Sequence, residues 1–501
     1  MTVIDEGRRA VLEMMAKTAV ATAAGLTLSS VGGCEIFLEQ IRKRPVRSDW
    51  ARLGTSDAIK DTYRAAVAAM KALPSSDPRN WTRQAEIHLN WCPHGNWWFL
   101  PWHRGYMLYF EQICRELTGE TRFALPYWNW TCNRSLPPEF LVSSPSNVLF
   151  DPTRNGGVNP PPPMSEFNVG TSVMTTILAE SNFLVFASGK VTGQRDRTTQ
   201  GPLESNPHNS VHGTVGAGGN FGTYRSPLDP IFWLHHSMVE RVWWEWNVIR
   251  GHANTNDAAW NNMRFDNQFV DRTGAAVMTN VALLNLAPLL SYQYDTSPFD
   301  HCGLPLASQI AIDRTKLREL LEKGGQVELR TIRTFAASRV VVLAVGDKAA
   351  EVLRVRDPAV SANIPLDPDD RVLLRLTDIE QPASGDFFVR VFVNMPGASV
   401  GTGIDDPHYA GSFAFFNDPN QQHSGHVHGN AAVLVDATNA VRRLRGMGEI
   451  TAGGELSIHL IATPFDQRRP GQTRLTIGRI ELELAKSIAP APAFSSPAAA
   501  R

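Results

Sequence analysis

The hydrophobic pattern of this 501-residue chain changes after Leu286, and this change limits the possible folds more than any other feature. Before it, apolar side chains recur at the spacing of one helix face, as in the segment 49–74. Later, apolar and polar residues alternate in short segments separated by turn residues, which is typical of antiparallel strands. We therefore expect a mainly α-helical domain over 45–300 and a β-rich domain over 325–487, built as an antiparallel sandwich or barrel.

Three further helices are predicted in the first domain. One covers "WHRGYMLYFEQICRELTGE" and ends at Gly119, and a short one follows Pro207. The third covers "DPIFWLHHSMVERVWWEWNVI", with Asp229 as its N-cap and Pro230 in its first turn.

The remaining segments lie outside these two domains. Residues 301–324 are expected to form a linker and one helix, and the low-complexity tail 488–501 is expected to be disordered. Residues 1–34 carry paired Arg8 and Arg9, a weakly apolar stretch and small residues up to a cysteine. This pattern resembles a twin-arginine export signal, and the alternative is an Ala-rich N-terminal helix. Export to the periplasm and a cytoplasmic location both stay open.

Composition excludes several classes of protein. Hydrophobic residues make up 43% and charged residues 19%, and the formal net charge is −1, so nucleic acid is not an expected partner. No run of roughly eighteen apolar residues occurs, so no transmembrane segment is predicted. The five cysteines are too few for a disulfide scaffold, and their odd number leaves at least one thiol without a partner in the chain.

Seven of the 14 histidines fall in three places in the helical domain, close to tryptophans. They fall into three groups, which are His88, His94 and His103, then His208 and His212, then His235 and His236. Positions i and i+4 share a helix face, so His208 and His212 can point at one metal ion, with a third imidazole from the later helix. Imidazoles without carboxylate or thiolate ligands suit copper or zinc. Spacing alone leaves a dicopper site, two zinc sites and ordinary core histidines open.

The motifs around these histidines resemble those of the type 3 copper family, which includes tyrosinases, catechol oxidases and molluscan haemocyanins. They are "WWFLPWHR", "FALPYWNW", "PHNSVH" and "DPIFWLHH", in this order. The resemblance implies a four-helix-bundle core that holds two copper ions, with dioxygen as co-substrate. By the same resemblance, His88, His94 and His103 bind copper A, whereas His208, His212 and His236 bind copper B. His235 is then a neighbour of copper B that shapes the substrate pocket.

Cys92, two residues before His94 in "CPH", has a counterpart in the same family. There this cysteine forms a thioether to the histidine, which would fix the orientation of the imidazole ring. The alternative is a buried free thiol. The spacing of His88 and Cys92 resembles that of plant polyphenol oxidases, with a shortened loop.

Two polar residues bear on the reaction that the resemblance implies. Glu204 matches the glutamate that orders a water near copper B, and Asn209 follows His208 where tyrosinases that accept monophenols often carry Asn. Together they would polarise a water that removes the phenol proton. The alternatives are an ordinary carboxylate at a helix start and a turn residue.

Thr223 stands thirteen residues before His236, where plant enzymes often carry a bulky Phe over copper A. A small residue there would leave the site open, and Phe221 and Tyr224 would take its place in another register. These positions favour a tyrosinase, which hydroxylates monophenols and oxidises o-diphenols to o-quinones. A catechol oxidase or o-aminophenol oxidase without monophenolase activity is the alternative, followed by a haemocyanin-like dioxygen-binding protein and a structural metal protein. Small phenols are the expected partners, and a homo-oligomer is left open.

The β-rich domain resembles the C-terminal domain of plant polyphenol oxidases, which covers the copper site and keeps the enzyme latent. We therefore expect a shield. Phe413, Phe415 and Phe416 are candidates for plugging the entrance, and a sandwich core is the alternative for all three. The histidines in "HSGHVHG" (423–429) are expected to form a polar loop rather than a metal site.

One motif departs from the family. Its usual "NVDR" is "MVER" here, and Arg241 is expected to pair with Asp229 at the start of the same helix. Tyr292 and Tyr294 match the Y-x-Y segment that closes the catalytic domain in relatives.

Overall fold

The computed structural model describes residues 44–295 and most of 328–488; the gaps in the latter are 338–339, 347, 357–366, 381, 383–384, 417–430, 452–454 and 469–473. The predictions for the export signal, the linker helix, the "HSGHVHG" loop and the tail beyond 488 lie outside the described residues.

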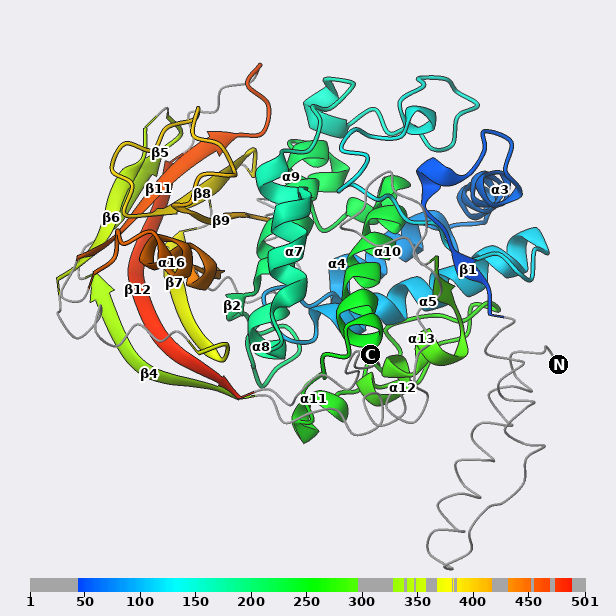
Figure 1. Cartoon of the computed structure of the whole chain (residues 1–501). Coiled ribbons are helices and arrows are strands. Elements are labelled where there is room, and N and C mark those ends of the chain that lie inside the picture. Colours follow the sequence, from blue (N-terminus) through cyan, green and yellow to red (C-terminus); the bar gives the residue numbers. More distant parts are fainter. Residues whose placement is uncertain are drawn as a thin grey trace, which may run out of the picture.

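Residues 44–295 form a mainly helical domain (Figure 1). Its α-helices are α3 (Ala58–Ala72), α4 (Trp81–Trp91), α5 (Phe99–Thr118), α6 (Glu166–Val169), α7 (Thr171–Ala179), α8 (Phe183–Phe186), α9 (Asn209–Gly216), α10 (Ile231–Trp244), α11 (Ala258–Asn261), α12 (Val281–Asn285) and α13 (Ala287–Leu290). Single turns are η1 (Trp50–Arg52), η2 (Pro138–Phe140), η3 (Arg154–Gly157), η4 (Glu204–His208), η5 (Asn220–Gly222), η6 (Ser226–Leu228) and η7 (Glu245–Ile249). The short strands β1 (Val46–Arg47) and β3 (Gln293–Tyr294) pair in parallel and bring the two ends of the domain together.

The helix boundaries follow the local signals. The Asp57 side chain accepts a hydrogen bond from the Ile59 amide and starts α3, and Gly119 ends α5 with a φ of 76°, which glycine adopts without strain. α10 begins two residues after Asp229, whose carboxylate accepts from the Ile231 amide at 3.1 Å. Pro207, which lacks an N–H, lies in the wide turn η4 that precedes α9.

The prediction for Arg241 was wrong. Asp229 pairs with Arg154, whose Nε lies 2.7 Å from the carboxylate, because the loop before α7 brings this arginine to the start of α10. Arg241 instead lies 3.7 Å from Glu245, one turn further along the helix. Both carboxylates are buried, so each has a cation beside it that lowers the cost of burying its charge.

Glu240, the other unusual residue of "MVER", joins a buried ionic cluster. Its carboxylate accepts from Arg104 at 2.8 Å and from the Tyr292 hydroxyl at 2.8 Å. Arg47 lies between Glu240 and Glu111, at 3.4 and 2.9 Å. The longer Glu side chain is thus accommodated by a network that connects α5, α10 and the closing strand.

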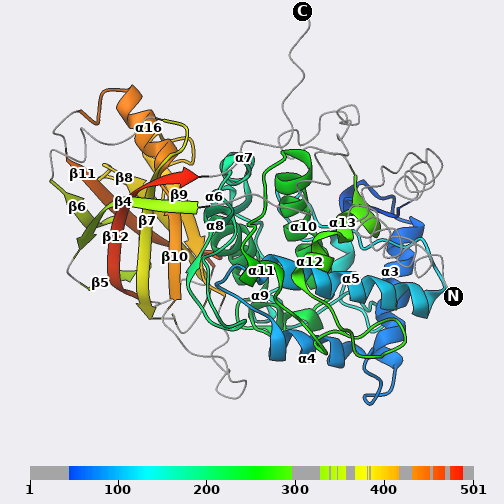
Figure 2. The ribbon, with the colours of Figure 1, turned by 90° about the horizontal axis from the view of Figure 1, so that it is seen from below.

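Residues 328–488 form a β-sandwich packed on one side of the helical domain (Figures 1 and 2). Its strands are β4 (Glu328–Ala337), β5 (Val341–Ala344), β6 (Ala350–Val355), β7 (Asp370–Glu380), β8 (Phe387–Val393), β9 (Tyr409–Ala414), β10 (Ala431–Asp436), β11 (Leu456–Pro464) and β12 (Arg474–Ile488), with helix α16 (Thr438–Gly446). One sheet has the order β2-β10-β7-β12-β4, in which β2 (Thr199–Gln200) comes from the helical domain and β5 also pairs with β12. The other sheet has the order β6-β11-β8-β9. Apolar side chains of both sheets share one core.

The fold class predicted from the sequence is confirmed, and the described strands of the sandwich form two open sheets rather than a closed barrel. In the described residues, no helix combines the length and apolar character needed to cross a membrane.

The two domains share a sheet. Strand β2 (Thr199–Gln200), from the helical domain, pairs in parallel with β10 of the sandwich. Arg371 forms a buried ion pair with Glu180 at 2.7 Å, and Asn155 donates to Asp466 at 3.0 Å. Gly213 on α9 lies so close to the sandwich that a Cβ at this position would be 2.6 Å from the Gly385 carbonyl oxygen.

Candidate metal centre

Three histidines from α4, α5 and the loop between them form a first cluster, His88, His94 and His103. Their candidate ligand nitrogens all lie within 4.8 Å of one another, and the residues are at most 4% exposed. The spacing of two helical residues and one loop residue lets three rings converge from different directions.

A second cluster comes from η4, α9 and α10, and it comprises His208, His212, His235 and His236. His208 and His212 are four residues apart and lie on one face, with ring centroids 4.6 Å apart. The Nε2 atoms of His212 and His236 are 3.4 Å apart. All four residues are buried.

The two clusters face each other across one interior space. The rings of His103 and His236 are stacked, with centroids 4.4 Å apart and planes 11° apart. The ring centroids of His94 and His208 are 5.5 Å apart. Seven imidazoles thus meet in a binuclear arrangement.

Hydrogen bonds fix the orientation of these rings. Nδ1 of His88, His103 and His212 lies 2.8, 2.8 and 2.6 Å from backbone carbonyl oxygens, so it carries the proton and leaves Nε2 as the lone-pair donor. Among the described residues, Nε2 of His94, His103 and His208 has no hydrogen-bond partner. Burial lowers the pKa of His208 to about 3 and that of His94 and His103 well below 6.5, so the rings are neutral. Neutral imidazoles aimed at one point fit a bound metal ion.

Comparisons with known proteins identify the metal. A family model described as the common central domain of tyrosinase matches residues 78–249, which include all seven histidines. Polyphenol oxidase A1 of Vicia faba is 25% identical over 88% of this chain and 77% of its own. The chain belongs to the type 3 copper family of tyrosinases and polyphenol oxidases. Its two clusters suit the two copper ions of this family, and it is therefore a copper oxidase.

Other relatives extend this assignment. The tyrosinase HcTyr1 of Hahella sp. (strain CCB-MM4) is 34% identical, over 46% of this chain and 59% of its own length. Among solved structures, recombinant latent aurone synthase matches with a TM-score of 0.62 and 23% identity, over 89% of this chain and 90% of its own. Latent apple tyrosinase matches with a TM-score of 0.60 and 21% identity, over 89% and 97%. These structures show that both domains of this type 3 copper protein have the polyphenol oxidase fold.

Cys92 lies beside His94, with Sγ 3.4 Å from Nδ1. It is 1% exposed, and burial raises the pKa of its thiol well above 9.0. In the described residues Cys92 and Cys114 are free thiols, whereas Cys132 is disulfide-bonded. The contact with His94 is compatible with the predicted thioether, which remains a prediction.

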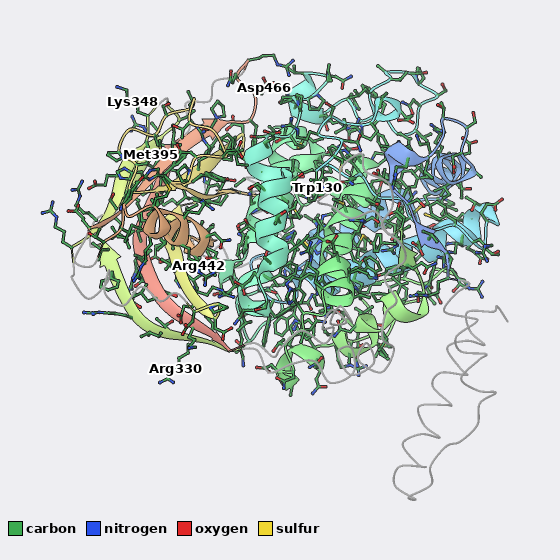
Figure 3. The ribbon with its side chains drawn as sticks, in the orientation of Figure 1. Trp130, Arg330, Lys348, Met395, Arg442 and Asp466 are labelled. Carbon is green, nitrogen blue, oxygen red and sulfur yellow. The ribbon has the colours of Figure 1, made fainter. Side chains whose placement is uncertain are left out.

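His235 lies next to His236 on α10 but makes different contacts, since the ring of His236 stacks on that of His103. Nδ1 of His235 accepts a hydrogen bond from the indole of Trp130, which lies in the helical domain (Figure 3), at 3.2 Å. The centroid of the His235 ring lies 4.8 Å from that of His212. The structure therefore places His235 within ligand range of the second cluster, with a tryptophan that fixes its ring.

Glu204 is held by three protein donors. Its carboxylate accepts from the Gly95 amide at 2.6 Å, the Ser188 hydroxyl at 2.6 Å and the Gln200 amide at 3.2 Å. Burial raises the pKa of Glu204 to about 7, although these hydrogen bonds oppose the increase. Sequence reasoning missed Ser188 and Gln200, because neither belongs to a recognisable motif.

Asn209 links the second cluster to the sandwich. Its side-chain oxygen lies 2.9 Å from Nδ1 of His208, and its amide nitrogen donates to Gln200 at 3.2 Å. The same nitrogen donates to the Ala414 carbonyl of β9 at 2.9 Å. Gln200 thus bridges Glu204 and Asn209 directly in this structure.

The prediction for Thr223 needs correction. Its hydroxyl donates to the Asn220 carbonyl within its own turn at 2.9 Å. Its two aromatic neighbours contact the clusters instead, since Phe221 stacks on His212 at 4.5 Å and Tyr224 lies edge-on to His94 at 5.1 Å. A small residue at 223 therefore does not leave the site open.

Phe416 fills the space above both clusters. Its ring centroid lies 4.9 Å from His94, 4.5 Å from His212 and 5.1 Å from Tyr224, and the residue is 4% exposed. Phe413 and Phe415 instead belong to the sandwich core, as the alternative interpretation held. Of the three candidates, only Phe416 lies among the histidines.

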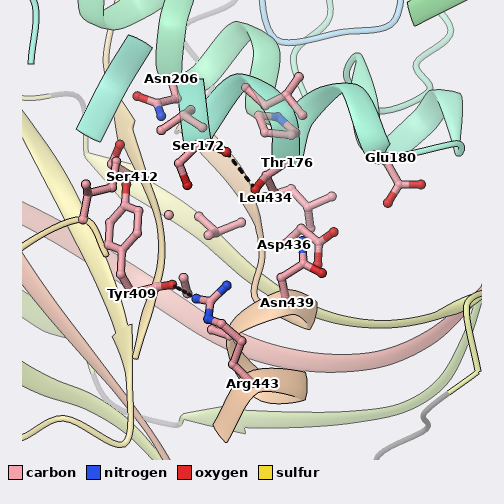
Figure 4. Close-up of a pocket in the computed structure, with 18 of the residues that line it drawn as sticks. Ser172, Thr176, Glu180, Asn206, Tyr409, Ser412, Leu434, Asp436, Asn439 and Arg443 are labelled. Carbon is pink, nitrogen blue, oxygen red and sulfur yellow. Dashed lines mark hydrogen bonds between the residues drawn. The ribbon is translucent and has the colours of Figure 1, made fainter. Parts of the chain in front are cut away.

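A separate cavity of ≈ 230 Å³ lies at the domain boundary, between α7, strands β9 and β10, and α16 (Figure 4). It is lined by polar groups such as Glu180 and Tyr409, and Arg443 crosses it to donate to the Tyr409 carbonyl at 2.7 Å. None of the seven clustered histidines lines it. We therefore treat this cavity as a gap in domain packing.

Proposed function

We propose that this chain is a latent tyrosinase, which uses dioxygen to hydroxylate monophenols in the ortho position and to oxidise o-diphenols to o-quinones. The observation that carries the proposal is the pair of facing histidine clusters, buried among aromatic rings and covered by Phe416. His88, His94 and His103 are assigned to copper A, and His208, His212 and His236 to copper B.

When bound, the copper pair supplies the activation of dioxygen for transfer to the phenol ring. The chain keeps the imidazoles neutral and oriented through the carbonyl groups on their Nδ1 atoms. Phe232, which lies 4.2 Å from His236, and Phe99, 4.7 Å from His103, exclude water around the clusters. His235 is proposed to border the phenol ring rather than to bind copper.

Glu204 and Asn209 are proposed to hold a water that accepts the phenol proton. A carboxylate with a pKa of about 7 is well matched to proton transfer near neutral pH. Asn209 lies next to the His208 ring, so the proton would leave beside the second cluster. Gln200 would move aside or orient the same water, because it now connects the two side chains.

Latency is proposed to result from Phe416. A phenol and the Phe416 ring have the same size and cannot occupy one space. The solved relatives with the same two-domain fold include latent aurone synthase and latent apple tyrosinase, which supports a closed ground state.

We also propose that the chain is exported before it works. The disulfide at Cys132 fits an oxidising compartment, and the paired arginines near the N-terminus fit twin-arginine export. Recovery of the folded protein from the periplasm, with loss of residues before Cys34, is the expected result. A protein found only in the cytoplasm would contradict it.

The test of the activity uses the copper-loaded full chain with tyrosine and with dihydroxyphenylalanine, before and after limited proteolysis. Oxygen-dependent hydroxylation of tyrosine after proteolysis is the expected result. Turnover of the diphenol alone would indicate a catechol oxidase. Reversible oxygen binding without turnover would indicate a carrier, and no oxygen chemistry at all would leave a structural metal protein.

A further inference from the structure

A basic side chain lies behind one wall of the space that Phe416 occupies. Tyr224 forms this wall, with its ring 5.1 Å from those of both Phe416 and His94. The Tyr224 hydroxyl accepts a hydrogen bond from the guanidinium of Arg197. Arg197 is therefore one side chain away from any ring that replaces Phe416.

The position of Arg197 is fixed from two sides. Its stem packs on Gly95, since a Cβ built on that residue would lie 3.6 Å from both Cβ and Cγ of Arg197. Strand β2, which begins two residues later, is paired with β10. The arginine is thus held beside His94 by the loop that leads into β2.

The charge around this wall is positive. Arg195 lies in the same loop, and the nearby Tyr224 hydroxyl raises the pKa of Arg197, so its guanidinium stays charged. Asp196, between the two arginines, has its carboxylate directed back to the Gly193 amide at 2.7 Å. The acidic group that faces Arg197 is Glu204, whose carboxylate is held by three other donors.

We infer that this site selects phenolic acids, which are phenols that carry an anionic substituent. Arg197 is the residue that recognises the carboxylate of such a substrate. The inference rests on the proposed function for the location of the phenol ring. A guanidinium has five N–H donors, so the bond to Tyr224 does not exhaust them. Arginine binds carboxylates through two parallel hydrogen bonds, which fix the orientation of the bound ring.

A purely structural role is the competing explanation, in which Arg197 only holds Tyr224 against His94. Such a role would affect neutral and anionic substrates equally. The relevant measurement is therefore the ratio of kcat/KM for 3,4-dihydroxyphenylacetate to that for 4-methylcatechol. Arg197→Gln is compared with Arg225→Gln, which removes the same charge from an exposed neighbour of Tyr224.

All variants are made in the Phe416→Ala chain, loaded with copper, so that the space is open. A charged hydrogen-bonded pair corresponds to a ratio change of about tenfold to hundredfold, which we expect for Arg197→Gln and not for Arg225→Gln. Dopamine, the cationic analogue, is expected to be oxidised relatively better by Arg197→Gln. An unchanged ratio in Arg197→Gln would overturn the inference.

A second readout does not depend on turnover. Calorimetry on the metal-free Phe416→Ala chain gives the dissociation constants of 4-hydroxyphenylacetate and 4-methylphenol. The preference for the acid is expected to fall by the same factor in Arg197→Gln. If neither diphenol is oxidised, the proposed oxidase is wrong, and this binding ratio alone decides whether Arg197 selects a carboxylate.

Discussion

Truncation of Phe416 gives the sharpest test of the closed site. Phe416→Ala removes a buried ring that contacts His94, His212 and Tyr224. Loss of a buried phenylalanine side chain costs about 3–5 kcal/mol. Since the ring is buried only while the sandwich covers the site, this cost falls on the closed state.

The size of the effect follows from the two-state equilibrium. A cost of about 3–5 kcal/mol changes the ratio of closed to open molecules by a factor of roughly 150 to 5000. A shield that is open in about 1% of molecules would then be open in more than about half of them. We expect the copper-loaded Phe416→Ala chain to oxidise 4-methylcatechol at least tenfold faster than the parent chain.

Oxygen uptake measures the rate, and Phe415→Ala provides the control. Phe415 is equally buried, but its ring lies in the sandwich core, away from the histidines. The control should lower the unfolding temperature by a similar amount without comparable activation. If Phe416→Ala is no more active than the parent, or if both variants are activated alike, the ring does not close the site.

Three further results are expected. Gly213→Val should activate the enzyme without any change in the histidines, because the valine side chain would collide with Phe465 and the Gly385 carbonyl of the docked sandwich. This collision exists only while the domains are docked, so an unchanged oxidation rate would show that the contact is dispensable. If Cys92 is bonded to His94, the mass of the copper-loaded, reduced chain should be two hydrogens lower than the mass calculated from its sequence. Cys92→Ser should abolish this difference, and an unchanged mass in the parent chain would exclude the bond. The metal-free chain should lose stability as the pH falls below 6.5, because burial lowers the pKa of the clustered histidines, which are neutral when folded and take up protons on unfolding. Each histidine lowers the free energy of unfolding by about 1 kcal/mol between pH 6.5 and 5.5. An unfolding temperature that stays constant over this range would contradict the burial argument.

The sequence predicts the helical half of the site well, because its signals are local. The pair His208 and His212 shares a helix face by spacing alone, and Gly119 ends α5 as expected. The fold class also follows from the change of hydrophobic period, since that change reports which side chains must be buried.

Contacts between distant segments could not be predicted in the same way. Arg154 reaches Asp229 across 75 residues, and nothing in the short motif around Arg241 distinguishes this pairing from a local one. Gln200 enters the site because β2 is held by β10, which requires the position of the second domain. Phe416 follows the core residues Phe413 and Phe415 in the sequence, so the pattern of apolar residues does not show whether its ring covers the histidines or packs in the sandwich core.

The contacts of Asn209 indicate that closure affects more than access. Its amide donates to the Ala414 carbonyl, two residues before Phe416, while its side-chain oxygen holds Nδ1 of His208. Undocking of the sandwich would remove the plug and this hydrogen bond together, and the same movement would separate β2 from β10 and release Gln200. Asn209 and Glu204 would then be free to share a water only in the open enzyme, because Gln200 connects them in the closed one. Under the proposed function, the sandwich would therefore block the phenol and withhold the proton acceptor together, and the open state would gain both at once.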